Sequence, residues 1–179
     1  MRDLTDMACN LVHGLCALVA PGLVAFSVSV ASAQTSQSPI RPLGDPTVLV
    51  IVEPASGRQI ELGLVELGQM PQTTIRTKTP WIGQDTSFEG VLVRDVLAAA
   101  KVKGASIRAR ALNDYAVEIP MADLTKYDVL LATRLDGRPM SVRDKGPYWI
   151  MYPFDAHAEL RTDRYYERAI WQVKSLEIR

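Results

Sequence analysis

The position of the two cysteines sets the strongest limit on how this 179-residue chain can fold. Cys9 and Cys16 both lie at the N-terminal end, and His157 is the only histidine after residue 33. Residues 34–179 therefore cannot form a disulfide, nor a zinc site of the usual Cys/His kind. They are numerous enough to form one domain, which must be held together by its hydrophobic core.

An apolar segment precedes that domain. Leu, Val and Ala dominate from Leu11 to Val30, and Ala31-Ser32-Ala33 places small residues where signal peptidase needs them. The apolar run is interrupted by His13, Gly14, Pro21 and Gly22. These interruptions favour a transient signal over a permanent membrane helix. We predict that residues 1–33 are a cleaved Sec-type signal peptide, that the mature protein is periplasmic, and that it does not insert into the membrane.

Two further features of the N-terminus bear on export. The residues ahead of the apolar run carry two acids against one arginine, so an uncleaved anchor and a start at Met7 instead of Met1 both stay possible. There is also no Arg-Arg pair, the mark of the twin-arginine route for folded, cofactor-loaded proteins. Sec-type export threads an unfolded chain and would leave behind a cofactor inserted in the cytoplasm.

The charge balance narrows the class of partner. The chain has 20 Lys plus Arg and 20 Asp plus Glu, and removal of residues 1–33 leaves a net charge near +1 because Arg2, Asp3 and Asp6 go with it. Such a balance gives no electrostatic basis for binding nucleic acid or an anionic membrane.

The mature sequence reads as one strand-rich domain. Residues 34–46 are rich in Ser, Gln and Pro and predict a flexible lead-in, which leaves 47–179 as the domain. A single clear helix is expected over 90–100, and 122–126 allow a turn or two. Short apolar or alternating runs predict strands at 48–52, 59–62, 75–79, 106–111, 115–119, 129–133, 139–142, 148–152 and 170–178. This pattern indicates a β-rich α+β domain.

Four segments, followed by Trp171-Gln-Val, carry a resemblance. They are Phe88–Leu97, Ala111–Pro120, Leu130–Met140 and Asp144–Pro153. In this order they resemble the oxidoreductase molybdopterin-binding domain of the sulfite oxidase type, over roughly residues 45 to 179. The resemblance implies an α+β fold with a mixed, barrel-like sheet arrangement and few helices, and a periplasmic location in the small bacterial members.

The resemblance also implies a cofactor. Active members bind a molybdenum-pterin group whose metal takes one cysteine sulfur from the stretch just upstream of the segment that matches Phe88–Leu97. Here that stretch, residues 73–81, offers threonine and lysine but no cysteine. A hydroxyl does not replace the soft thiolate on which such a metal site depends. We therefore expect no metal ligands, no catalytic residues and no bound cofactor, with molybdopterin implied by the resemblance alone.

Polar loops offer a candidate site for a small anion. Two arginines, a lysine and a glycine amide could hold a phosphate or carboxylate, and a nearby turn could add polar groups, with Trp149 or Tyr152 as a stacking surface. The candidate ligand-binding residues are Arg143, Lys145, Gly146, Arg134, Asn113, Asp114 and Tyr115. The alternative is that these residues only form turns and solvated surface. Tyr165, Tyr166 and Arg168 are interpreted as a packing and capping cluster.

Three functions follow from these observations. The first is a periplasmic binding or accessory module for a small anionic ligand or for a periplasmic or membrane protein partner. The second is an active molybdopterin-dependent oxidoreductase with unusual metal ligation. The third, a metal-free hydrolase, has least support, because His157 lies in a polar stretch that predicts a solvated loop without a nucleophile beside it.

Overall fold

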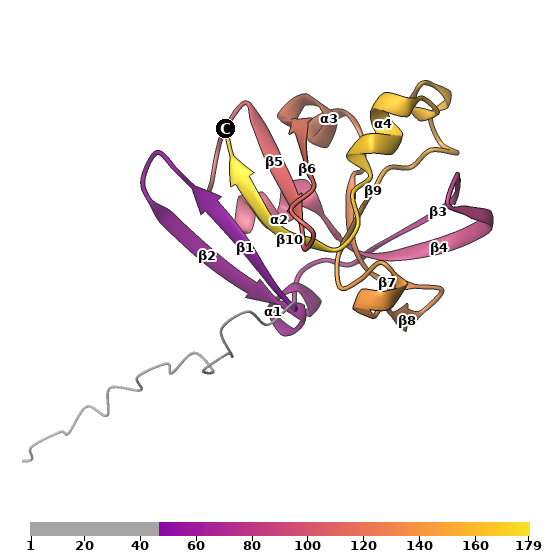
Figure 1. Ribbon diagram of the computed structural model, residues 1–179, viewed down its shortest axis with the longest axis horizontal. Coiled ribbons are helices and arrows are strands. Elements are labelled where there is room, and N and C mark those ends of the chain that lie inside the picture. The colour runs from indigo at the N-terminus through magenta and orange to yellow at the C-terminus, as the bar shows by residue number, and fades with distance from the viewer. Residues whose placement is uncertain (1–46) are drawn as a thin grey trace, which may run out of the picture. The chain divides into compact units, whose positions relative to one another are not determined.

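Ten strands in two five-stranded sheets form the domain in the computed structural model, which describes residues 47–179 (Figure 1). The first sheet has the order β2-β1-β10-β5-β6. Its strands are β1 (Val48–Glu53), β2 (Arg58–Gly63), β5 (Ser106–Ala111), β6 (Ala116–Pro120) and β10 (Val173–Ile178). The second sheet has the order β3-β4-β7-β8, with β9 paired to β7. Its strands are β3 (Thr73–Thr79), β4 (Ile82–Leu92), β7 (Leu130–Leu135), β8 (Arg138–Pro139) and β9 (Trp149–Met151).

The helices are short. They are α1 (Leu64–Gly68), α2 (Val93–Ala99), α3 (Met121–Lys126) and α4 (Asp163–Arg168), with 3-10 turns at Val142–Asp144 and Ala158–Leu160. Figure 1 shows α3 and α4 at the same end of the two sheets. No helix in residues 47–179 is long and apolar enough to cross a membrane. The predicted signal peptide and lead-in, residues 1–46, lie outside the described residues.

Strand direction differs between the sheets. In the first sheet β10 runs parallel to β1, with Ile51 opposite Leu176, and antiparallel to β5. Every pair in the second sheet is antiparallel. The domain is therefore a β-rich α+β fold with one mixed and one antiparallel sheet and few helices, which confirms the fold class predicted from the sequence.

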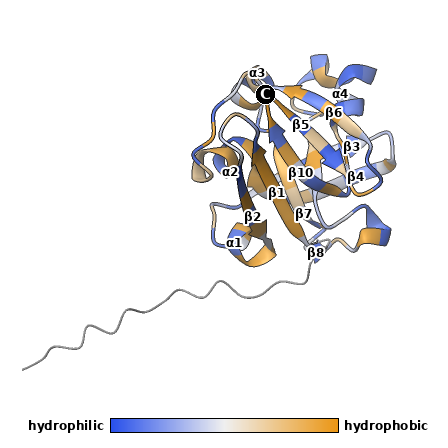
Figure 2. Cartoon of the chain, turned by 60° about the vertical axis from the view of Figure 1, so that its left-hand side comes forward, coloured by the Kyte–Doolittle hydropathy of each residue, from blue (hydrophilic) through white to orange (hydrophobic). Residues whose placement is uncertain are grey.

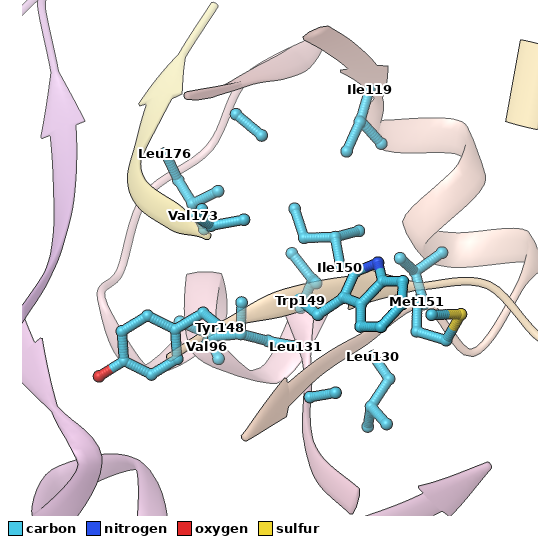
Figure 3. Close-up of a cluster of buried hydrophobic side chains, with 14 of the residues drawn as sticks. Val96, Ile119, Leu130, Leu131, Tyr148, Trp149, Ile150, Met151, Val173 and Leu176 are labelled. Atoms are coloured by element: carbon cyan, nitrogen blue, oxygen red, sulfur yellow. The ribbon is translucent and has the colours of Figure 1, made fainter. Parts of the chain in front are cut away.

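The core lies between the sheets, around β9. Figure 3 shows Trp149, Ile150 and Met151 of β9 among buried side chains of β7 and β10. Leu49 and Ile51 of β1 are equally buried, whereas Figure 2 shows α4 as largely hydrophilic. Strands supply most of the core, and α2 adds Val93, Val96 and Leu97, whereas α4 contributes no buried residue.

The predicted elements differ from the structure mainly around the central helix. The helix expected over 90–100 begins at Val93, because Gly90 to Leu92 extend β4 and pair with β7. That strand was not predicted, since its first half is polar. The strand expected over 170–178 begins at Val173, and the partner strand expected over 139–142 is confined to Arg138–Pro139. The helices α1 and α4 were also not predicted.

Candidate functional site

The three tryptophans of the chain meet in one cluster. Trp149 is fully buried, and its ring lies 5.8 Å from Trp81 and 6.0 Å from Trp171 between centroids. Its indole N–H donates to the carbonyl of Ala169 at 3.1 Å. A backbone bridge between Trp149 and Trp171 connects the second sheet to the segment that enters β10. Trp81 and Trp171 are thus fixed, half-buried, on top of a core residue.

A pocket of about 500 Å³ opens above this cluster. The β3–β4 turn, the β5–β6 turn, α4 and the segment after α4 form its walls. Its lining residues are Trp81, Ala111, Asn113, Tyr115, Asp163, Tyr166, Glu167, Ala169, Ile170 and Trp171. Four of them are aromatic, two are carboxylates and none is basic. A mostly apolar pocket of this size with a few polar groups is the usual form of a small-molecule site.

An ion pair holds α4 in its place at the pocket. The Arg168 guanidinium donates to Asp123 on α3 at 2.8 Å, with side chains only 17% and 11% exposed. The Tyr152 hydroxyl donates to the same carboxylate at 2.9 Å. Burial, reinforced by the Asp123 charge, raises the pKa of Tyr152, so this hydroxyl stays protonated. Because α4 has no fully buried residue, this polar anchor fixes where the pocket-facing side chains of α4 lie.

The β5–β6 turn brings two of the predicted residues into the pocket. Asn113 accepts the N–H of Tyr115 through its side-chain oxygen at 3.1 Å, and both residues line the pocket. Asp114 has a positive φ of 66° and binds Lys174 at 2.7 Å. The hydrogen bond from Lys174 lowers the pKa of Asp114. Asp114 therefore belongs to a surface ion pair and is not among the pocket-lining residues.

The Arg143–Gly146 loop is arranged differently from the expected anion clamp. The Gly146 N–H donates to the Ser141 carbonyl at 2.8 Å and is thus already bonded within the protein. The Lys145 ammonium lies 4.5 Å from the ring centroid of Trp171. Arg143 is exposed, and Arg134 is exposed on β7 and donates to the Gly137 carbonyl at 3.4 Å. Of these residues only Lys145 approaches the pocket, by stacking on one of its walls.

The structure gives several side chains a role other than the one predicted from the sequence. Trp149 and Tyr152 are fully buried, so the expectation that either offers a stacking surface for a ligand is wrong. Tyr166, interpreted as packing, does pack on Phe154 at 5.0 Å but also lines the pocket. His157 is half-buried against the Tyr127 ring at 5.1 Å.

The donor atoms do not fit a thiolate-bound metal. Residues 47–179 contain no cysteine, and no group of three His, Cys, Asp or Glu side chains in them could hold an ion. Within β3, the Thr77 hydroxyl accepts the Asp155 N–H at 3.1 Å and the Thr79 hydroxyl accepts the Ile82 N–H at 3.0 Å. No buried side-chain nitrogen or oxygen in the described part of the chain lacks a hydrogen-bond partner.

Comparisons with known proteins show which family the domain belongs to. The sequence matches no curated protein. Among solved structures, the sulfane dehydrogenase SoxCD from Paracoccus pantotrophus superposes with a TM-score of 0.57 at 19% identity, over 78% of this chain and 39% of that one. The chain therefore spans about two-fifths of that protein, and the likeness shows the fold. The model of the oxidoreductase molybdopterin binding domain matches residues 49–154. This match covers more than half of the sequence, and the chain belongs to the oxidoreductase molybdopterin-binding domain family.

Proposed function

We propose that the protein is an exported binding or accessory module that has kept the fold of the molybdopterin-binding family and lost its metal redox chemistry. The observation that carries the proposal is the chemistry of β3 and the turn after it. The family resemblance places the metal-binding sulfur in this stretch, but residues 73–81 supply no thiol, and the hydroxyls of Thr77 and Thr79 are bonded to neighbouring backbone amides. A protein thiolate tunes the redox properties of such a metal site, and this stretch supplies none.

The aromatic pocket is the ligand site in this proposal. Its walls come from four separate segments, which the Trp149 core and the Arg168–Asp123 pair hold in fixed positions. Preformed walls reduce the ordering cost of binding. Such a pocket suits a small molecule or one side chain of a protein partner.

The small anionic ligand expected at the Arg143–Gly146 loop stays a prediction. What supports it is Arg143, whose exposed guanidinium forms no ion pair with any of residues 47–179. Replacing Arg143 and Lys145 together with alanine should abolish any stabilisation by phosphate or a carboxylate, with little change in the melting temperature of the free protein. A double variant that still responds to the anion would place that ligand elsewhere.

The competing function is an active molybdopterin-dependent oxidoreductase with unusual ligation. The two are separated by the molybdenum content of protein purified from a molybdate-fed host, measured by elemental mass spectrometry together with sulfite and sulfoxide turnover. We expect far less than one metal atom per chain and no turnover. One molybdenum atom per chain would establish the oxidoreductase instead.

Export has its own test. The Ala31-Ser32-Ala33 site predicts cleavage after Ala33, and the intact mass of protein recovered from the periplasm measures it. A mass that retains residues 1–33 would indicate a membrane anchor.

A further inference from the structure

Four aromatic residues from separate segments line the pocket: Trp81, Tyr115, Tyr166 and Trp171. The rings of Trp81 and Trp171 meet at 5.5 Å with an angle of 73° between their planes, and those of Trp81 and Tyr166 at 6.1 Å with 83°. Tyr115, 48% exposed, adds a further wall from the β5–β6 turn. The face of an aromatic ring carries negative potential, so a pocket lined by four aromatic residues can attract a cation wherever a ring face is open to it.

The charged residues of the pocket have one sign. Asp163 and Glu167 are four residues apart on α4, so their side chains lie on the same helix face, and both line the pocket. Neither forms an ion pair with another of the described residues, whereas Asp123 beneath α4 and Asp155 in the preceding loop are both paired with arginines. The lining of the pocket thus carries two carboxylates and no basic residue, and the nearest cation named here, the Lys145 ammonium, lies on the Trp171 ring at its edge.

The protein itself already places a cation on this cluster. The Lys145 ammonium lies 4.5 Å from the Trp171 centroid and 5.7 Å from that of Trp149, without lining the pocket. These distances are within the range of attraction between an ammonium and an indole face. The tryptophan cluster therefore accommodates an alkylammonium at the edge of the pocket.

We propose that the pocket binds a small organic cation that carries a quaternary or otherwise alkylated ammonium group. The alkyl groups would contact the four rings, and Asp163 and Glu167 would supply the counter-charge. A volume of about 500 Å³ is ample for such a ligand. The proposal takes from the proposed function only that this pocket is the ligand site, and it does not depend on the absence of metal.

The ligand class can be tested with two molecules of nearly the same shape. Choline has a trimethylammonium group where 3,3-dimethylbutan-1-ol has an uncharged tert-butyl group. All three tryptophans of the chain lie in the cluster, so intrinsic fluorescence reports binding directly. We expect choline to change the emission in a saturable way at constant ionic strength, with an affinity about tenfold higher than that of the alcohol.

Variants locate the site. Asp163→Asn combined with Glu167→Gln should weaken choline binding about tenfold and leave binding of the alcohol unchanged. Glu61→Gln, which removes one exposed carboxylate on β2 outside the pocket lining, is a charge control and should leave choline binding unchanged. Tyr115→Leu removes one ring face at an exposed turn, so the fold should tolerate it, and it should also weaken binding. A melting curve of each free variant confirms that it is folded.

Several results would overturn the proposal. They are equal affinity for choline and the alcohol, no saturable response to choline, choline binding that survives both pocket variants, and stabilisation by phosphate in the absence of any response to choline. Molybdenum content is measured separately, so the cation proposal and the proposed loss of metal chemistry can fail independently.

Discussion

Replacing Gly90 with alanine tests whether the two central strands of the second sheet pack as closely as the structure indicates. A Cβ built on Gly90 would lie 2.9 Å from the Ala132 Cα and the Leu131 carbonyl carbon, and closer still to the Leu131 oxygen. These are backbone atoms of β7, which β9 holds from its other side through the Leu131–Ile150 pair. The strand therefore cannot move aside without disturbing the core.

The expected cost follows from that geometry. Adding a methyl group to a well-packed core usually destabilises a protein by about 1–3 kcal/mol, and a clash with fixed backbone belongs at the upper end. We expect Gly90→Ala to lower the free energy of unfolding by about 3 kcal/mol, or the melting temperature by on the order of 10 °C. The measurement is a denaturant or thermal unfolding curve followed by circular dichroism.

The same strand supplies the control. A Cβ on Gly83 of β4 would meet nothing within 4 Å. Gly83→Ala should therefore be neutral or stabilise by about 0.4–1 kcal/mol, because alanine restricts the unfolded chain. A Gly90→Ala protein as stable as Gly83→Ala would refute the close approach of β4 and β7.

Three further substitutions address the core, the α4 anchor and the surface turn. Leu131→Ala should destabilise by about 2–5 kcal/mol in the same assay, because this side chain is fully buried in β7; a loss under about 1 kcal/mol would contradict its central position. Arg168→Met should lower the free energy of unfolding by about 3–5 kcal/mol, because it leaves the Asp123 carboxylate buried without its partner. Adding Asp123→Asn should recover part of that loss. Equal stability of Arg168→Met and wild type would show that the pair does not hold α4. Lys174→Met should raise the pKa of Asp114 toward its usual value in an NMR titration, and an unchanged pKa would contradict the pairing. Because folding lowers the pKa of Asp114, the Lys174–Asp114 pair contributes stability above about pH 4, and this contribution is lost as the pH falls below that value.

Most strands could be predicted because their burial follows the sequence pattern. β5 alternates, and β1 is a continuous apolar run that ends up beside β10 inside the sheet. The start of α2 could not be predicted, because Gly90 to Leu92 fit a helical pattern and only pairing with β7 keeps them extended. The helix α4 has no apolar periodicity, and its anchor, Asp123, lies 45 residues away in the sequence.

Only those parts of the candidate site that have a local sequence signal could be predicted. Asn113 and Tyr115 were recognisable because turn chemistry marks the β5–β6 connection, and they do line the pocket. Trp81 and the acidic side chains of α4 come from segments with no local signal, and only the tertiary fold brings them to that turn. The Gly146 N–H, which the sequence analysis assigned to an anion, donates instead to the Ser141 carbonyl within its own turn.

The pterin content of the protein tests the central claim most directly, namely that this member of the family keeps the fold without the cofactor. The full-length protein would be expressed in a host that makes molybdopterin and purified from the periplasm, and any pterin would be released by oxidation and measured by its fluorescence. We expect no more pterin than in an unrelated periplasmic protein purified from the same host. One pterin per chain would contradict the account and identify a cofactor-bound oxidoreductase.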